Sequence, residues 1–261
     1  MKLIALGTGG FIPTASRETA CFLVIEHNIA FLLDAGSGVK WLNDDRIKGM
    51  LSGIKNMNLL LSHFHHDHIA GLPWLYKLVP CPLNIYAPCQ PLVDYNGLDA
   101  LKTYISPPYF ERPLDSWPNL GKLVAINKST ILIEGIEVNC LRQKHPGGSV
   151  AYRIGSLAYI TDADAGDEQR EFLRGCSVAL MDTMFNRAEY ESKGFSSVRR
   201  GSHGYGHGNA TIARDTGIAK LGLIHLHPMY SQTDLVNLLT EARKVFDQSI
   251  ILETGEVIFV D

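Results

Sequence analysis

The stretch at residues 62–68 constrains the fold of this chain more than any other. It reads Ser-His-Phe-His-His-Asp-His and follows three leucines at residues 59–61. Consecutive leucines without a helical stripe predict a buried strand of about five residues. His63 and His65 lie two positions apart, so in an extended chain or a tight loop their side chains point the same way. A regular pattern restarts at Pro73, which suits the first turn of a helix. A strand end, a histidine-rich loop and a helix start together favour a metal site.

The ligand types in this stretch indicate which metals it would hold. Imidazole nitrogens favour zinc and other borderline transition metals, and a carboxylate such as that of Asp67 can serve a second ion. The alternative is a surface cluster of histidines that binds metal only adventitiously. The position at the end of a buried strand argues against that alternative.

The pattern His-x-His-x-Asp-His also resembles the signature of the metallo-β-lactamase superfamily. It is formed here by His63, His65, Asp67 and His68, and later motifs follow in the superfamily's order along nearly the whole chain. The resemblance implies an α/β fold of the αββα type, in which two β-sheets pack face to face between outer helices. It places the metal site at one edge of this sandwich, where the loops at strand ends converge.

Strand and helix patterns elsewhere agree with a layered α/β domain. Strands are expected at residues 2–6, 21–25, 29–33, 58–61, 83–86, 123–126, 130–133, 136–141, 150–154, 157–160, 178–181, 221–225, 250–252 and 257–260. Helices are expected at residues 91–104, 209–216 and 235–246. No linker, repeat or low-complexity tract divides the chain, so we expect one domain over residues 1–261.

Length, charge and cysteines limit the class of protein. A chain of 261 residues is long enough for a sizeable core, and a net charge of −3 gives no global attraction to nucleic acid or to anionic membranes. Five widely spaced cysteines without a CxxC pair are typical of thiols in a reducing compartment. The N-terminal apolar run is broken by glycine too early for a signal peptide, and no apolar stretch is long enough to span a membrane. We therefore expect a cytoplasmic enzyme without a membrane partner.

Asp34 ends the strand expected at residues 29–33, where a charge costs free energy unless it has a partner. One interpretation is a turn aspartate that accepts hydrogen bonds from its own backbone. The resemblance implies instead a carboxylate that orients a metal-bound histidine, because the first motif of the superfamily is an aspartate at such a strand end.

Three further residues each follow an expected strand, namely His145, Asp162 and His227. By resemblance, one ion is held by His63, His65 and His145, the other by Asp67, His68 and His227, and Asp162 bridges the two. We expect two divalent ions per chain, Zn²⁺ first because imidazoles dominate the set, with Mn²⁺ and Fe²⁺ as alternatives. The class B β-lactamases generally have cysteine at the bridging position, so Asp162 makes the chain a poor match to them.

Residues 206–213, followed by residues 223–227, resemble the phosphodiesterase branch that includes ribonuclease Z. In that branch a Gly-His-Ser/Thr element precedes a helix and then the last metal histidine, although here Gly208 replaces the hydroxyl residue. Asp67 and His207 are the predicted catalytic residues, His207 as the general acid that protonates the leaving group. His203 and Tyr205 are competing donors, and a packed loop histidine is the alternative.

The substrate is expected to be a small, possibly cyclic, phosphodiester or nucleotide rather than a long nucleic acid. Sixteen residues separate His145 from Asp162, which is room for one hairpin. By resemblance, the long arm with which ribonuclease Z grips transfer RNA is therefore absent, as in bacterial cyclic phosphodiesterases. A basic region with Arg187, Lys193, Arg199 and Arg200 is either a solvated loop or a clamp for one phosphate and its base. His203 and Tyr205 join Arg199 and Arg200 as predicted substrate-binding residues.

Other functions and assemblies stay open at this stage. A thioesterase, a lactonase or a transfer-RNA 3′-processing endonuclease would share most of these motifs. A degenerate binding module is a further alternative, but degenerate members lose ligands, and none of the seven is missing here. The segment at residues 106–118, rich in proline and aromatic residues, is a lid, a packing element or a dimer contact. Members of the phosphodiesterase branch are often homodimers, so we expect a homodimer by resemblance.

Overall fold

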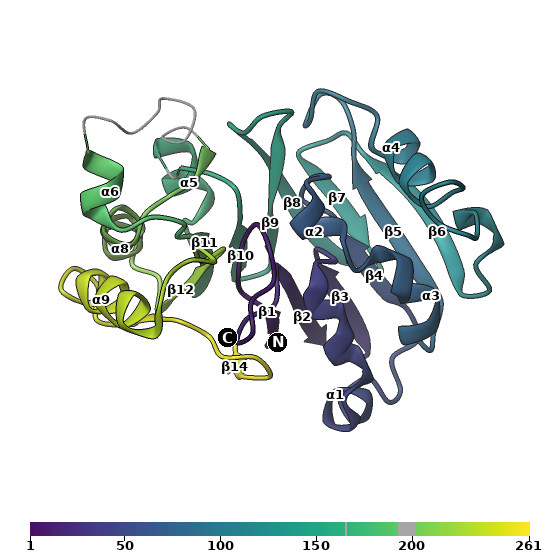
Figure 1. The fold of residues 1–261 in the computed structure, drawn as a ribbon, viewed down its shortest axis with the longest axis horizontal. Coiled ribbons are helices and arrows are strands. Elements are labelled where there is room, and N and C mark those ends of the chain that lie inside the picture. Colours follow the sequence, from purple (N-terminus) through teal and green to yellow (C-terminus); the bar gives the residue numbers. More distant parts are fainter. Residues whose placement is uncertain (165, 193–201) are drawn as a thin grey trace.

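The computed structural model describes residues 1–164, 166–192 and 202–261, and two β-sheets form its centre (Figure 1). In the first sheet the strands lie in the order β14 (Val257–Phe259), β1 (Lys2–Gly7), β2 (Cys21–Glu26), β3 (Ile29–Leu33), β4 (Met57–Leu60), β5 (Leu83–Pro88) and β6 (Leu120–Ile126). In the second the order is β13 (Ser249–Ile250), β12 (Lys220–Ile224), β11 (Val178–Asp182), β10 (Leu157–Ile160), β9 (Ser149–Ile154), β8 (Ile136–Gln143) and β7 (Thr130–Ile133).

Helices cover the outer face of each sheet (Figure 1). Those beside the first sheet are α1 (Asp45–Met50), α2 (His66–Ile69), α3 (Leu75–Leu78) and α4 (Gly97–Tyr104), with the 3₁₀ turns η1 (Ser37–Asn43), η2 (Leu72–Trp74) and η3 (Leu114–Ser116). Those beside the second are α5 (Asp167–Phe172), α6 (Arg187–Glu191), α8 (Gly206–Thr216) and α9 (Gln232–Arg243). Among the described residues, no helix is both long and apolar enough to cross a membrane.

Three apolar layers hold this arrangement together. One lies between the sheets and contains Phe22, Phe31, Tyr152 and Tyr159, and the other two lie between each sheet and its helices. The central strands are buried on both faces, which explains why they read as continuous apolar runs rather than as alternating patterns. The predicted αββα sandwich is therefore confirmed.

Several expected boundaries differ from the observed ones. The helix expected over residues 91–104 begins only at Gly97, where Asn96 accepts a hydrogen bond from the Leu98 backbone. The helix expected from residue 209 begins at Gly206 instead. β12 ends at Ile224, one residue earlier than expected.

Parallel strand pairing brings polar strand ends to one edge of the sandwich. β3, β4 and β5 are parallel in the first sheet, and β10, β11 and β12 are parallel in the second. Parallel strands end on the same side of a sheet, so the residues that follow β3, β4, β10 and β12 meet at one edge. These residues include Asp34, Ser62, Asp162 and His225.

Candidate metal centre

Three of the residues at strand ends have positive φ angles, a backbone conformation that residues other than glycine rarely adopt. The φ angles of Asp34, Asp162 and His225 are 57°, 50° and 55°. Such left-handed positions cost free energy and persist where the surrounding structure fixes them, often at functional sites. Here each one turns the chain sharply after a buried strand.

The first group of candidate ligands is formed by His63, His65, His145 and Asp162. One ligand atom from each lies within 4.8 Å of those of the other three. Nε2 of His145 is 3.0 Å from Nδ1 of His65, and Oδ2 of Asp162 is 3.6 Å from Nε2 of His63. Nε2 of His63 is buried without a hydrogen-bond partner. A buried nitrogen of this kind, facing a carboxylate and two imidazoles, fits a metal ion.

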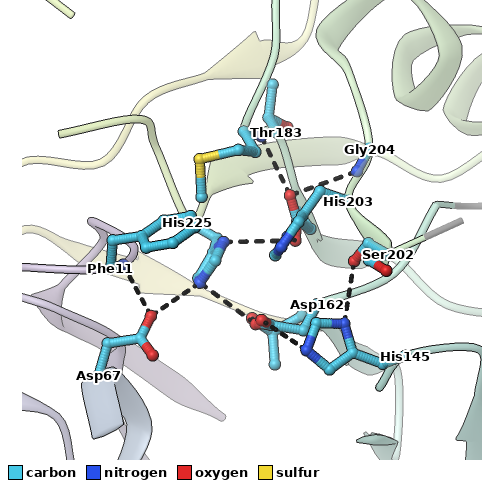
Figure 2. A network of polar contacts seen from close by, with 12 residues as sticks. Phe11, Asp67, His145, Asp162, Thr183, Ser202, His203, Gly204 and His225 are labelled. Atoms are coloured by element: carbon cyan, nitrogen blue, oxygen red, sulfur yellow. Dashed lines mark hydrogen bonds and ion pairs between the residues drawn. The ribbon is translucent and has the colours of Figure 1, made fainter. Parts of the chain in front are cut away.

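The second group consists of Asp67, His68 and His225, and both histidines also contact Asp162. Nε2 of His225 lies 3.0 Å from Oδ2 of Asp67 and 3.3 Å from Oδ1 of Asp162 (Figure 2). Nε2 of His68 lies 2.9 Å from the same Asp162 oxygen. The two oxygens of Asp162 therefore face different groups, Oδ2 the first and Oδ1 the second.

Asp34 holds one histidine of the second group, His68, in position. Its Oδ2 lies 2.7 Å from Nδ1 of His68 and accepts hydrogen bonds from the hydroxyls of Ser62 and Tyr159 at 2.7 and 2.6 Å. Its Oδ1 accepts from the Ser62 backbone N–H at 2.7 Å. These contacts fix the His68 ring with Nε2 toward Asp162, in the position that the resemblance implied for Asp34.

Asp182 and His203 form a third set of contacts beside the two groups. Nδ1 of His203 lies 2.8 Å from Oδ2 of Asp182, and Nδ1 of His225 lies 3.4 Å from the same oxygen. The rings of His203 and His225 are parallel, 5.2 Å apart (Figure 2). Asp182 also accepts from the Met184 backbone N–H, so its own position is fixed.

Burial and neighbouring charges shift the pKa values of these groups in opposite directions. Burial would lower the pKa of His68 and His225, but the carboxylates around them raise both well above the usual value. Burial opposes ionisation of Asp162, yet His225, His68 and His63 hold its pKa well below the usual range. Burial lowers the pKa of His145 to about 4. Asp162 is therefore anionic, and the first group is rich in neutral imidazole, the form that binds metal.

The groups open into a cavity of about 380 Å³. Its lining combines residues of both groups with His66, Pro146, Ser202 and His203, and with Phe11, Phe185 and His227. Among the described residues that line it, none is a lysine or an arginine. The cavity has room for a small ligand and is aromatic on one side.

A family model for the beta-lactamase superfamily domain matches residues 30–226, a range that contains every member of the three sets of contacts. The chain belongs to the beta-lactamase superfamily. Among curated members, it is 25% identical to "Ribonuclease BN" of Salmonella paratyphi C, over 94% of this chain and 95% of that protein. It is 23% identical to "Ribonuclease Z" of Methanosarcina mazei, over 97% of this chain and 96% of that protein.

Solved structures of the superfamily share the fold. The metallo-beta-lactamase fold protein YhfI from Bacillus subtilis superposes with a TM-score of 0.74 at 22% identity, covering 98% of each chain. The short form of human tRNase Z gives 0.69 at 18% identity, covering 100% of each chain. The predictions of a hydrolase of this superfamily, related to ribonuclease Z, and of its αββα fold are confirmed.

Most of the residues predicted for the superfamily site lie together. The seven that meet as expected are His63, His65, Asp67, His68, His145, Asp162 and, beside them, Asp34. His227 does not join them, and His225 faces Asp67 and His68 in its place. The reason is the end of β12 at Ile224, because the turn at His225 then points that side chain inward and leaves His227 at the cavity wall.

His207 lies elsewhere than its predicted role requires. It stands in the first turn of α8, its Nε2 is 3.4 Å from the Arg187 guanidinium, and the cavity lining does not include it. Of His207 and His203, it is His203 that lines the cavity. Tyr205 stacks on Tyr190 at 4.1 Å rather than lining the cavity. Arg199 and Arg200, with Lys193, lie outside the described residues.

The sequence motifs do not predict a role for Asp182. It is the last residue of β11 and so carries the same signal as Asp34 and Asp162, a carboxylate at or just beyond the end of a buried parallel strand. That signal, applied to every strand end of the superfamily fold, would have found it.

Proposed function

We propose that this protein is a phosphodiesterase with two metal ions that acts on a small phosphodiester. The observation that carries the proposal is the position of Asp162. Its Oδ2 lies 3.5–3.6 Å from the His145 and His63 nitrogens, and its Oδ1 lies 2.9–3.3 Å from those of His68 and His225. A carboxylate placed between two imidazole groups suits a bridge between two divalent ions.

The ligand sets follow from these contacts. His63, His65 and His145 would hold one ion, Asp67, His68 and His225 the other, and Asp162 both. A pair of divalent ions supplies an activated water and stabilises charge on the attacking and leaving oxygens. Zinc is the proposed metal because imidazoles dominate both sets, with manganese or iron as alternatives.

His203 is the proposed general acid. Its Nδ1 is held 2.8 Å from Oδ2 of Asp182, which leaves Nε2 as the nitrogen that can donate to a leaving oxygen. A general acid gives its proton to the leaving oxygen as the ester bond breaks. Asp182 thus positions His203 without touching the substrate.

The test is hydrolysis of bis-p-nitrophenyl phosphate by protein reconstituted with zinc. We expect turnover that His65→Ala abolishes and that His27→Ala leaves unchanged, because His27 is an exposed histidine outside the site. A panel of other phosphodiesters, thioesters and lactones belongs to the same experiment. Turnover of thioesters or lactones without any phosphodiester turnover would overturn the proposal in favour of a carboxyl-ester hydrolase.

A second candidate is a transfer-RNA 3′-processing endonuclease. It is favoured by the ribonuclease Z and ribonuclease BN relatives, which align with this chain over 94–97% of its length. The cavity argues for the smaller substrate, since the described residues that line it include no lysine or arginine to bind a chain of phosphates.

We also propose a cytoplasmic homodimer. All five cysteines are free thiols, which suits a reducing compartment. In the segment at residues 106–118, Phe110 packs against Tyr76, whereas Tyr109 is 72% exposed and available to a second subunit. Light scattering should give twice the mass of the 28.8 kDa chain, and a monomer mass would remove this proposal.

A further inference from the structure

Phe11 has an unusual combination of exposure and backbone conformation. Its side chain is 58% exposed, and its φ angle is 64°. A bulky residue at positive φ is a genuine outlier, because Cβ crowds the backbone in that region. Glycine would adopt this conformation without strain and would expose no apolar surface.

The loop that carries Phe11 is fixed against the metal centre. The Phe11 backbone N–H donates to Oδ2 of Asp67 at 2.8 Å (Figure 2). The preceding Gly10 donates to the Leu226 carbonyl at 3.1 Å, and a Cβ on Gly10 would lie 2.6 Å from the His225 ring. These contacts use only the backbone, so they explain the position of the loop but not the choice of an aromatic side chain.

The Phe11 ring belongs to a group of rings on one side of the cavity. The ring centres of Phe11 and Phe185 lie 6.1 and 6.2 Å from that of His203, and those of Phe185 and His227 lie 6.3 Å apart. His227 in turn stacks on Tyr230 at 5.0 Å. Phe11, Phe185 and His227 all line the cavity, which they share with both ligand groups.

We propose that Phe11, Phe185 and His227 form a subsite for a flat aromatic group, an aryl ring or a nucleobase, that is ester-linked to the phosphate. Aromatic side chains bind such rings by stacking whatever their hydrogen-bonding edges. The strained, exposed Phe11 is thereby explained as a residue kept for its ring rather than for the stability of the loop. The subsite rests on the proposed phosphodiesterase function, because the metal ions would hold the phosphate beside it.

The test measures binding by calorimetry to zinc-loaded protein, so that its readout does not depend on turnover. The aryl arm compares phenylphosphonate, cyclohexylphosphonate and methylphosphonate, and the nucleobase arm compares uridine 5′-monophosphate with ribose 5-phosphate. We expect the ring-bearing ligand of each arm to bind about tenfold more tightly than its partner without a ring. Cyclohexylphosphonate should resemble methylphosphonate, since stacking requires a flat ring.

Phe11→Ala should abolish this preference, and Phe11→Tyr should retain it. Both variants keep the backbone N–H that binds Asp67, so their zinc content should equal that of the parent. The absence of a ring preference in both arms, an unchanged preference in Phe11→Ala, or a preference for phenylphosphonate over methylphosphonate that cyclohexylphosphonate shares would each overturn the subsite. A preference for rings in only one arm supports the subsite and shows whether it takes aryl groups or nucleobases. If the ring preference is present but no phosphodiester is hydrolysed, the proposed function fails and the subsite stands.

Phe11→Gly distinguishes the contribution of the ring from that of the backbone conformation. Glycine relieves the strain at φ 64°, so this variant should unfold at a temperature equal to or above that of the parent while losing the preference for aromatic ligands. A clear fall in unfolding temperature would show that the ring is kept for stability and would overturn the proposal.

Discussion

The imidazoles of His203 and His225 lie parallel, with ring centres 5.2 Å apart and planes 7° apart. Nδ1 of each ring is directed at the same oxygen of Asp182, at 2.8 Å for His203 and 3.4 Å for His225. One buried carboxylate therefore contacts both a proposed metal ligand and the proposed general acid. A change at Asp182 should affect proton transfer and the second ion together, whereas changes at the two histidines should separate these effects.

The leaving group should reveal the role of His203. Since a poor alkoxide leaving group needs the proton, His203→Ala should lower kcat for a methyl or nucleoside leaving group by about 10²–10⁴-fold. The loss should be far smaller for p-nitrophenolate, which departs without help. Steady-state kinetics on a series of aryl and alkyl diesters measures this difference.

His207→Ala is the matched control for that series. His207 lies in α8 beside Arg187, so its removal should change kcat by less than about threefold for every leaving group, well below the loss expected of a general acid. If His207→Ala shows the leaving-group dependence and His203→Ala does not, the assignment of the acid is reversed.

Asp182→Asn should reduce kcat for poor leaving groups by about 10²-fold, because Asp182 contacts Nδ1 of His203 and so orients the ring that donates the proton. The dependence on the leaving group gives a readout that a packing defect would not move. We expect the loss to be far smaller for p-nitrophenolate, as for His203→Ala. An equal loss for every leaving group would mean that Asp182 acts only in folding.

Replacing His225 and replacing His227 should have different effects on the number of bound metal ions. His225→Ala removes a nitrogen that faces Asp67 and Asp162, so elemental analysis should find about one ion per chain instead of two. His227→Ala should retain the metal content of the parent, because His227 lies in the cavity wall. Loss of metal from His227→Ala alone would restore the ligand set expected from the sequence.

Asp34→Asn should weaken metal binding by about 10–100-fold, since Asp34 orients His68 and raises its basicity. Tyr159→Phe is the control, because it removes another partner of the same Asp34 oxygen without touching His68. Both should lower the free energy of unfolding by roughly 1–3 kcal/mol, but only Asp34→Asn should change metal affinity much. Chelation should also lower the unfolding temperature of the parent, as ions that bind only the folded state stabilise it.

The sequence predicts the metal ligands that follow long apolar strands. It does not predict a ligand whose identity depends on the exact residue at which a strand ends. Asp34, His63 and Asp162 lie within three residues of the ends of strands that are buried on both faces, so the apolar pattern and the ligand positions agree. For the last ligand, two histidines stand two positions apart, and only the exact end of β12 selects His225 over His227. Strand ends cannot be read from hydrophobicity to that precision.

The start of α8 was misplaced for a different reason. Asn209 has the side chain of a favoured N-cap, which predicts a helix beginning there. In the fold its side chain is buried and donates to the Thr183 hydroxyl at 3.0 Å and to the Asp182 carbonyl, so it ties the helix to the end of β11 instead. The Asn209 side chain therefore makes a tertiary contact instead of capping the helix, and His207 lies inside the helix as a result.

The substrate range gives the last prediction. Processing of a precursor transfer RNA requires many cationic contacts to phosphates, and these produce a steep loss of affinity with salt. This chain has a net charge of −3, and the described residues that line its cavity include no lysine or arginine. We therefore expect cleavage at the 3′ end to be at least about 100-fold less efficient than that by a ribonuclease Z assayed in parallel, as expected from the loss of several phosphate contacts. Hydrolysis of small diesters should change little between low and physiological salt, because one phosphate is held by the proposed ions rather than by a basic surface. Efficient, salt-sensitive cleavage of the precursor would instead assign the cavity to a ribonuclease.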